Sequence, residues 1–373
     1  MKWKLFLFLM LSLWFFAGCW DQKIIEQTGA VLQLGVELSP ENRLLVTSIY
    51  PAFDSRIPNR DEIITTEADL LREAREKTRM VAAKKVAGGK IQQIFFSKAI
   101  AAQGIQNLLE VFERDPLNPP LAEIVIVDGS PKELLERAQT FAAKPRAVLY
   151  LDQLQANNAN LSYIPETRMY DFIIRYLAPG LDPVTPLVKL EPDGIKVLGS
   201  ALFAEDKMVG ELNTQQTGFL LTMMGQAPQT EFGFISSGGQ RESQPKREGV
   251  KKGIFLTITS SRRRIRPAMK NQRLLIDLSL NFQGNLDEYD RDMLDEAGVQ
   301  KDLEKQLAEE IKIICQNIFA YMQEIGSDPL GIGDLVRAKH YADWKRMDWR
   351  ESYRNAEVNI TVRLDILQYG TIK

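Results

Sequence analysis

Few residues in this chain have the types and spacing that catalysis requires. His340 is the only histidine, so a Ser–His or Cys–His nucleophile pair would have to use it. It stands in a basic stretch at 337–341, where a histidine at a helix end complements the helix dipole. The sequence has no Cys-x-x-Cys, no histidine pair, no calcium loop and no phosphate-binding glycine loop, so we expect neither a metal nor a cofactor. A hydrolase using two carboxylates stays open, but the sequence favours a protein that is not an enzyme.

The first residues of the chain predict a different chemistry, the attachment of lipid to a thiol. Two lysines lie within the first four residues, and an apolar run follows at 5–16. This pattern is typical of a secretory signal, and the run is shorter than the roughly 20 residues that cross a bilayer. The small residue Gly18 directly before Cys19 resembles the lipobox of bacterial lipoproteins. We therefore expect cleavage between Gly18 and Cys19, with a diacylglycerol on the sulfur and an acyl group on the new amino terminus.

The densest group of charges is a run of arginines in the second half of the chain: Arg262, Arg263, Arg264 and Arg266. We favour a strand end or turn whose charges are solvated. Contact with an anionic lipid headgroup or an acidic partner is the second interpretation, because each basic residue near an anionic membrane contributes about 1 kcal/mol. Nucleic acid is a poor candidate, since no aromatic residues alternate with the arginines.

A glycine-containing turn near the carboxyl end is a further candidate for partner contact. Gly331 and Gly333 are spaced as in a tight turn with a close backbone approach. Trp344 follows in an aromatic group that also holds Trp349 and Tyr353. A local core is the commoner role of such a group, but Gly331, Gly333 and Trp344 are also possible contacts with a partner.

Composition is that of an ordinary globular protein, with 45% hydrophobic and 26% charged residues and a net charge of −2 among 373 residues. If Cys19 carries lipid, the second cysteine, Cys315, has no partner for a disulfide. It lies on an apolar helix face, and we expect it to be a small core residue.

The first half of the chain alternates expected strands and helices. Apolar β-rich runs at 29–38 and 44–53 predict a hairpin, and helices are expected at 66–87, 98–113 and from Ser130 to about 143. The prolines between 176 and 192 predict irregular backbone there. A second hairpin, at 195–204 and 207–212, precedes a helix at 214–224, and a polar surface loop is expected at 236–252.

The last third predicts a sheet covered by a helix. Strict alternation at 276–282 and 358–366 is typical of antiparallel strands with one buried face, and 254–259 adds a third strand. Apolar residues at three- and four-residue steps between 299 and 322 predict the covering helix. We therefore expect an α+β or mixed α/β multidomain protein: a signal peptide (1–18), an N-terminal α/β domain (19–190), a small middle domain with a hairpin and a helix (191–228), and a C-terminal α+β domain (229–373).

Several short segments together resemble one family, the Ger(x)C lipoproteins, which are the C subunits of bacterial spore germinant receptors. The matching segments are GCWD at 18–21, AAQG at 101–104, RDP at 114–116, GLDPVTP at 180–186, GSALF at 199–203, KMVGEL at 207–212, RIRP at 264–267, DPLGIG at 328–333 and EVNITV at 357–362. Their order and spacing over nearly the whole chain make the resemblance specific.

The resemblance implies a receptor subunit without catalytic activity, required for spore germination. It implies a lipid anchor on the outer face of the spore inner membrane, and two polytopic partners, the A and B subunits. An exported lipoprotein that captures a solute for a transporter is the alternative. Such a protein would have two large lobes joined by a hinge, and the proline-rich stretch at 179–192 could serve as one.

Overall fold

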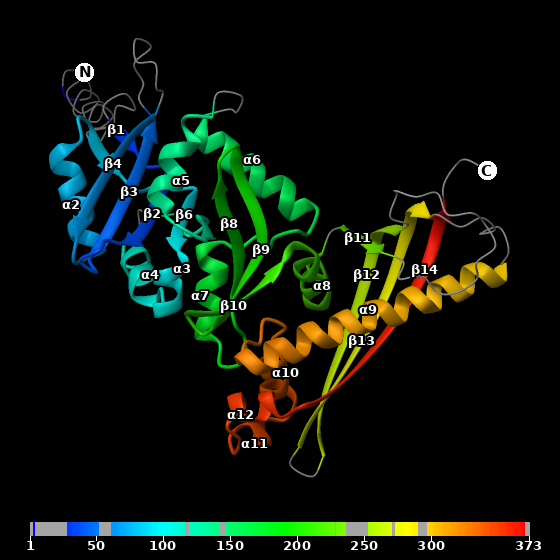
Figure 1. Ribbon diagram of the computed structural model, residues 1–373. Helices are drawn as coiled ribbons and strands as arrows, with labels where there is room; N and C mark the ends of the chain where they lie inside the picture. Colours follow the sequence, from blue (N-terminus) through cyan, green and yellow to red (C-terminus); the bar gives the residue numbers. More distant parts are fainter. Residues whose placement is uncertain are drawn as a thin grey trace.

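The computed structural model describes residues 3, 28–51, 61–115, 119–141, 146–227, 229–235, 253–270, 273–289 and 297–369. The expected cleavage site at Gly18 and Cys19 and the expected loop at 236–252 lie outside these residues. The described chain forms two main β-sheets with helices packed on them (Figure 1). The mixed α+β multidomain class expected from the sequence is confirmed.

The larger sheet has eight strands in the order β10-β9-β8-β7-β6-β2-β3-β4. The inner pairs β8–β7, β7–β6 and β6–β2 are parallel, and the outer pairs are antiparallel. The strands are β2 (Gln33–Leu38), β3 (Leu44–Pro51), β4 (Asp61–Ala68), β6 (Gln93–Ser97), β7 (Glu123–Val127), β8 (Val184–Glu191), β9 (Gly194–Ala204) and β10 (Lys207–Asn213). Two short strands, β1 (Thr28–Ala30) and β5 (Lys85–Ala87), form a separate parallel pair.

Helices cover both faces of the larger sheet, because its central strands are apolar on both sides. In β6, Ile94 and Phe96 face one core and Phe95 faces the other. The first face carries α2 (Leu71–Val81), α3 (Lys98–Gln103), α4 (Gln106–Glu113) and α7 (Met169–Leu177). The second carries α5 (Pro131–Ala138) and α6 (Ala147–Asn160).

Several expectations about this half were wrong. The helix expected over 98–113 is divided into α3 and α4 at Gly104, which has φ 111°. The region expected as a helix over 66–87 contains the end of β4, then α2, then β5. Pairing with neighbouring strands decides both ends, since Thr66 lies opposite Val46 and Val86 lies opposite Gly29. The proline-rich stretch is also more regular than expected, because β8 includes Pro186. On its β7 side this strand pairs only through Leu187 and Val188, so the proline removes no hydrogen bond from that pairing.

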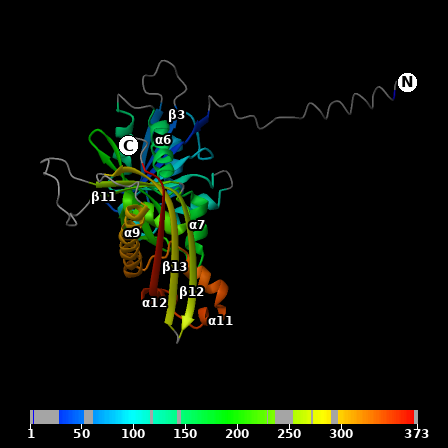
Figure 2. The ribbon, with the colours of Figure 1, turned by 90° about the vertical axis from the view of Figure 1, so that its right-hand side faces the viewer.

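The smaller sheet has four strands in the order β11-β12-β13-β14, with bounds Thr230–Ile235, Gly253–Lys270, Arg273–Tyr289 and Glu357–Tyr369. The 29-residue helix α9 (Ala297–Ile325) covers one face (Figure 2). Its expected apolar stripe is confirmed, since Leu303, Leu307 and Ile311 are buried in the core. The expectation of purely antiparallel strands was wrong, because β14 runs parallel to β13. Helix α9 lies between β13 and β14 in the chain and brings it back along the sheet, so both strands start at the same end of the sheet.

Helix α8 (Thr214–Met224) links the two sheets: its buried side chains lie in one core with those of the smaller sheet and α9. Three short helices, α10 (Ile332–Lys339), α11 (Tyr341–Trp344) and α12 (Trp349–Arg354), follow α9. Hydrogen-bonded strands continue across residue 190, since β8 pairs with both β7 and β9. The domain divisions at 190 and 228 stay predictions. Among the described helices, none is long and apolar enough to cross a bilayer.

Candidate functional site

The two halves of the chain meet where the segment before β8 lies against the segment between α9 and α10. The backbone N–H of Asp182 donates to the carbonyl of Asp328 at 2.9 Å, and the N–H of Asp334 donates to the carbonyl of Gly180 at 3.0 Å. We call this contact the junction and define it by Gly180, Asp182, Asp328, Gly333 and Arg350.

The carboxylate of Asp182 lies at the centre of the junction and is fully buried. Arg350 of α12 donates to both of its oxygens, from Nη1 to Oδ2 at 2.5 Å and from Nη2 to Oδ1 at 2.8 Å. The backbone N–H of Asp328 donates to Oδ2 at 2.6 Å, and that of Glu205 donates to Oδ1 at 2.8 Å. A bidentate guanidinium with two further donors satisfies a buried carboxylate, so these four hydrogen bonds replace the water that the carboxylate loses on folding.

Asp328 contributes a second buried carboxyl to the junction. Its oxygens accept hydrogen bonds from the backbone N–H groups of Ile332, at 3.1 Å, and Gly333, at 2.8 Å. Burial raises the pKa of Asp328 to about 7, while the two backbone donors oppose that rise. The carboxyl thus holds the turn that begins α10 in place from the inside.

Gly331 and Gly333, expected as partner contacts, are buried within the chain. Gly331 adopts a left-handed conformation with φ 73° at the start of α10 and lies beside Leu181. A Cβ on Gly333 would lie 2.6 Å from the Cα of Gly180 and 2.5 Å from Cε2 of Trp349. These glycines therefore permit the close approach of two backbones inside the junction.

We expect Gly333→Ala to lower the free energy of unfolding by about 1–3 kcal/mol, because a methyl group added to a filled interior forces the backbones apart. The measurement is the urea midpoint of the purified chain followed by circular dichroism. Gly298→Ala is the matched control, since a Cβ there meets nothing within 4 Å and alanine favours the helix. Equal midpoints for the two variants would contradict this role of Gly333.

The aromatic residues beyond the junction form a local core. Trp344 and Trp349 have ring centroids 5.3 Å apart, and Trp349 lies 5.5 Å from Tyr353. The hydroxyl of Tyr353 donates to the carbonyl of Ser327 at 3.0 Å, which ties α12 to the junction. Trp344 remains half-buried, so contact with a partner stays a prediction for this residue.

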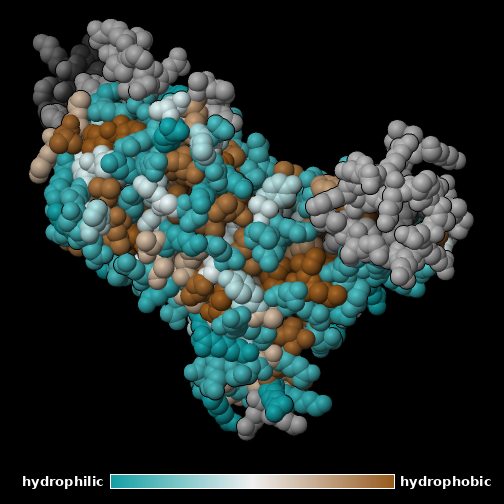
Figure 3. Space-filling model, viewed as in Figure 1, coloured by the Kyte–Doolittle hydropathy of each residue, from teal (hydrophilic) through white to brown (hydrophobic). Residues whose placement is uncertain are grey.

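The arginine run lies within β12, so its interpretation as a strand end or turn was wrong. Strand β11 pairs only with the first part of β12, through Ile258, and the arginines occupy the edge that continues beyond it. Arg262, Arg264 and Arg266 lie on one face of the strand and are exposed. Charged side chains on an open edge prevent the pairing of further strands. Strands β12 and β13 pair along nearly their whole length, and we call this pair the β12–β13 ribbon. The limb of the molecule that contains this ribbon is largely hydrophilic on the face seen in Figure 3.

Arg263 points to the opposite face and has a separate role. Its Nη1 donates to the carbonyl of Met223 at 2.9 Å, near the end of α8, and its side chain passes over Gly225. Partial burial lowers the pKa of Arg263. The four arginines therefore do not form one patch, and their contact with a partner or a membrane stays a prediction.

Two other residues singled out from the sequence are placed by the structure. Cys315 is buried in the core of the C-terminal half, where burial raises the pKa of its thiol to about 12. His340 ends α10, and its Nε2 lies 3.3 Å from the carbonyl oxygen of Pro267. The described residues contain no group of three or more side chains that could hold a metal ion.

The junction itself was missed by sequence reasoning. Asp182 and Arg350 are 168 positions apart, and Asp182 and Asp328 are 146 apart. Both aspartates precede a proline within the segments 180–186 and 328–333, which were recognised as motifs but not as partners. No local pattern indicates that these two segments meet.

Comparison with known proteins identifies relatives along nearly the whole chain. The family model described as spore germination protein N-terminal domain matches residues 21–190. The family model described as spore germination B3/GerAC-like, C-terminal matches residues 198–370. Spore germination protein GerQC of Bacillus cereus is 22% identical over 98% of both chains. Spore germination protein B3 of Bacillus subtilis is 20% identical over 100% of this chain and 98% of its own.

A solved structure shows the same fold. The crystal structure of the GerBC protein superimposes with a TM-score of 0.59 at 15% sequence identity, covering 92% of this chain and all of the other. Both halves of the chain are therefore matched by models of one family, in the expected order, and the chain belongs to the Ger(x)C family of spore germination proteins.

Proposed function

We propose that this chain is the lipid-anchored C subunit of a nutrient germinant receptor and acts in spore germination together with polytopic A and B subunits. The observation that carries the proposal is the match of both family models, in order, over residues 21–190 and 198–370. The relatives are named as spore germination proteins, which supports a role in germination for this chain too.

In this proposal Cys19 holds the protein on the outer face of the spore inner membrane. Two kinds of acylation on one residue support a firm anchor, because a single acyl chain binds a bilayer only marginally. Eight residues separate Cys19 from β1, which limits the tether to about 30 Å when fully extended. The end of the β12–β13 ribbon lies at the opposite end of the molecule from β1 (Figures 1 and 2). This placement favours a protein partner over the anchoring bilayer for Arg262, Arg264 and Arg266.

The proposed role is structural rather than catalytic. The ring of His340 faces a backbone carbonyl, and the two buried carboxyls of the junction are engaged by Arg350 and by backbone N–H groups. A carboxylate pair for hydrolysis needs one group that is free to exchange protons with a substrate. The junction therefore supports assembly of the two halves.

The alternative, a solute-capturing lipoprotein, is less well supported. A protein that captures a solute between two lobes is expected to have two similar sheets, one on each side of a hinge. Here one half has an eight-stranded mixed sheet and the other has four strands under a single long helix, and the buried ion pair of Asp182 and Arg350 fastens the halves together.

Co-purification tests the proposal. The chain, tagged at its carboxyl end and extracted from spore membranes with mild detergent, is expected to bring down two polytopic subunits identified by mass spectrometry. An extract from spores with the untagged chain serves as control. Recovery of the tagged chain without any polytopic protein, under conditions that preserve the chain's own fold, would count against the receptor assignment.

A further inference from the structure

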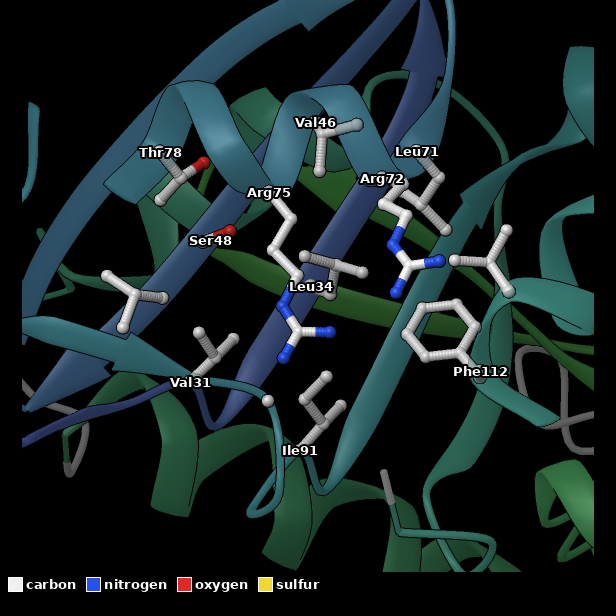
Figure 4. Close-up of a pocket in the computed structure, with 13 residues that line it drawn as sticks. Val31, Leu34, Val46, Ser48, Leu71, Arg72, Arg75, Thr78, Ile91 and Phe112 are labelled. Atoms are coloured by element: carbon white, nitrogen blue, oxygen red, sulfur yellow. The ribbon is translucent and has the colours of Figure 1, made fainter. Parts of the chain in front are cut away.

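A small apolar cavity opens beneath α2 in the N-terminal half (Figure 4). It has a volume of about 60 Å³. A single water needs only roughly 10–15 Å³, so there is room for several non-hydrogen atoms. The walls come from the larger sheet, the β1–β5 pair, α2 and α4, and they include Leu34, Val46, Ser48, Arg72, Arg75 and Val111.

The apolar walls are themselves buried, which makes the cavity part of the interior rather than a surface hollow. Leu34 and Val46 are 7% and 3% exposed. An apolar cavity that stays empty lowers stability, because its lining atoms lack partners on one side. A ligand with an apolar body would supply those contacts.

Two arginines give the cavity a positive rim. Arg72 and Arg75 lie three positions apart on α2, and both guanidinium groups extend toward the side where Ile91 and Phe112 lie (Figure 4). Arg75 forms an ion pair with Asp115, from Nη1 to Oδ2 at 2.6 Å. Within the described part of the chain, Arg72 has no ion pair. The rim thus carries one positive charge more than Asp115 neutralises, which matches a monoanion.

A polar group is also present on the cavity wall. Ser48 is 4% exposed, and its side chain lines the cavity. Its hydroxyl is a donor that an acceptor on a ligand in the cavity would engage. Arginine forks fit a planar carboxylate in a bidentate arrangement.

We propose that this cavity binds a small carboxylic acid, with the apolar body beneath α2 and the carboxylate held by Arg72 and Arg75. The inference goes beyond the receptor role, since it concerns only the N-terminal half and does not depend on partners. A phosphate ligand fits less well, because it carries more charge than the rim supplies and leaves the apolar walls unfilled.

Calorimetric titration of the purified full chain in detergent micelles tests the proposal. Acetate, 3-methylbutanoate, hexanoate and phenylacetate are the probes, and 3-methylbutanamide and inorganic phosphate are the chemical controls. We expect saturable binding of at least one of the larger carboxylates. The uncharged amide should bind at least about tenfold more weakly than 3-methylbutanoate, since it loses a charge-assisted hydrogen bond.

Variants separate this site from non-specific binding. Arg72→Gln should weaken carboxylate binding about tenfold or more. Arg79→Gln is the matched control on the same helix, because Arg79 is paired with Glu76 and does not line the cavity, and it should leave binding unchanged. Val111→Phe should block the cavity, with an unchanged circular dichroism spectrum showing that the variant is folded. Absence of binding by all four carboxylates, equal binding of the amide, or full binding by Arg72→Gln overturns the proposal.

Discussion

A Cys19→Ala chain is expected to lose its lipid, to leave the membrane fraction of spores and to abolish the germination response to nutrient. The thiol of Cys19 is the proposed acceptor of diacylglycerol, and cleavage of the signal depends on that modification. The uncleaved apolar run at 5–16 is too short to hold the protein across a bilayer. Mass spectrometry of the amino-terminal peptide, fractionation of spore lysates and a germination assay give three readouts.

The chain offers a matched control in its other cysteine. Cys315→Ala removes a thiol that is buried among the core residues of α9, so it should keep the lipid, the membrane location and the germination response. If the Cys19→Ala protein were still to carry lipid, or if its spores were to germinate normally, the tether would not be the basis of function.

Arg350→Met is expected to lower the free energy of unfolding by about 3–5 kcal/mol, because it leaves the buried carboxylate of Asp182 without its counter-ion. The carboxylate of Asp182 is fully buried, and among the described residues only the side chain of Arg350 donates to it. Urea denaturation of the purified chain at neutral pH, followed by circular dichroism and by tryptophan fluorescence, measures the effect.

An exposed ion pair in the same region provides the comparison. Arg337 and Asp334 lie 2.6 Å apart on α10, with both side chains nearly half exposed. Arg337→Met should cost at most about 1 kcal/mol, the usual contribution of a surface pair. A loss of similar size in both variants would mean that the buried ion pair of the junction contributes no more to stability than an exposed one.

Local patterns in the sequence were sufficient for several elements. The hairpin of β2 and β3, the amphipathic α9 and the alternating strands β13 and β14 were all expected, because each depends on neighbours within a few residues. Ser130 was also expected to cap its helix, and its Oγ accepts a hydrogen bond from the N–H of Glu133.

Elements that depend on distant partners were not predictable in the same way. The expected helix over 66–87 is divided because strands outside it, β3 and β1, pair with its two ends. The direction of β14 is set by α9, which lies between β13 and β14 in the chain, and alternation within the strand does not reveal this direction.

The candidate sites also differ in whether they depend on local or on distant residues. Cys19 could be singled out because its signal is confined to the first residues of the chain. Gly331 and Gly333 were recognised as a close backbone approach, but the other backbone, at Gly180, could not be identified from sequence spacing. The cavity beneath α2 was missed altogether, since its walls come from segments spread over residues 31–112.

The parallel pairing of β13 and β14 has a consequence for the order of folding. The last strand of the larger sheet ends at Asn213, so that sheet can be completed before the second half of the chain has been made. The smaller sheet gains its fourth strand only when residues up to Tyr369 are present. Contacts that join distant parts of a chain form late, and a nascent chain folds from its amino terminus. Until β14 arrives, β13 has an open edge, so a chain that lacks β14 should have a folded first half and a second half that aggregates.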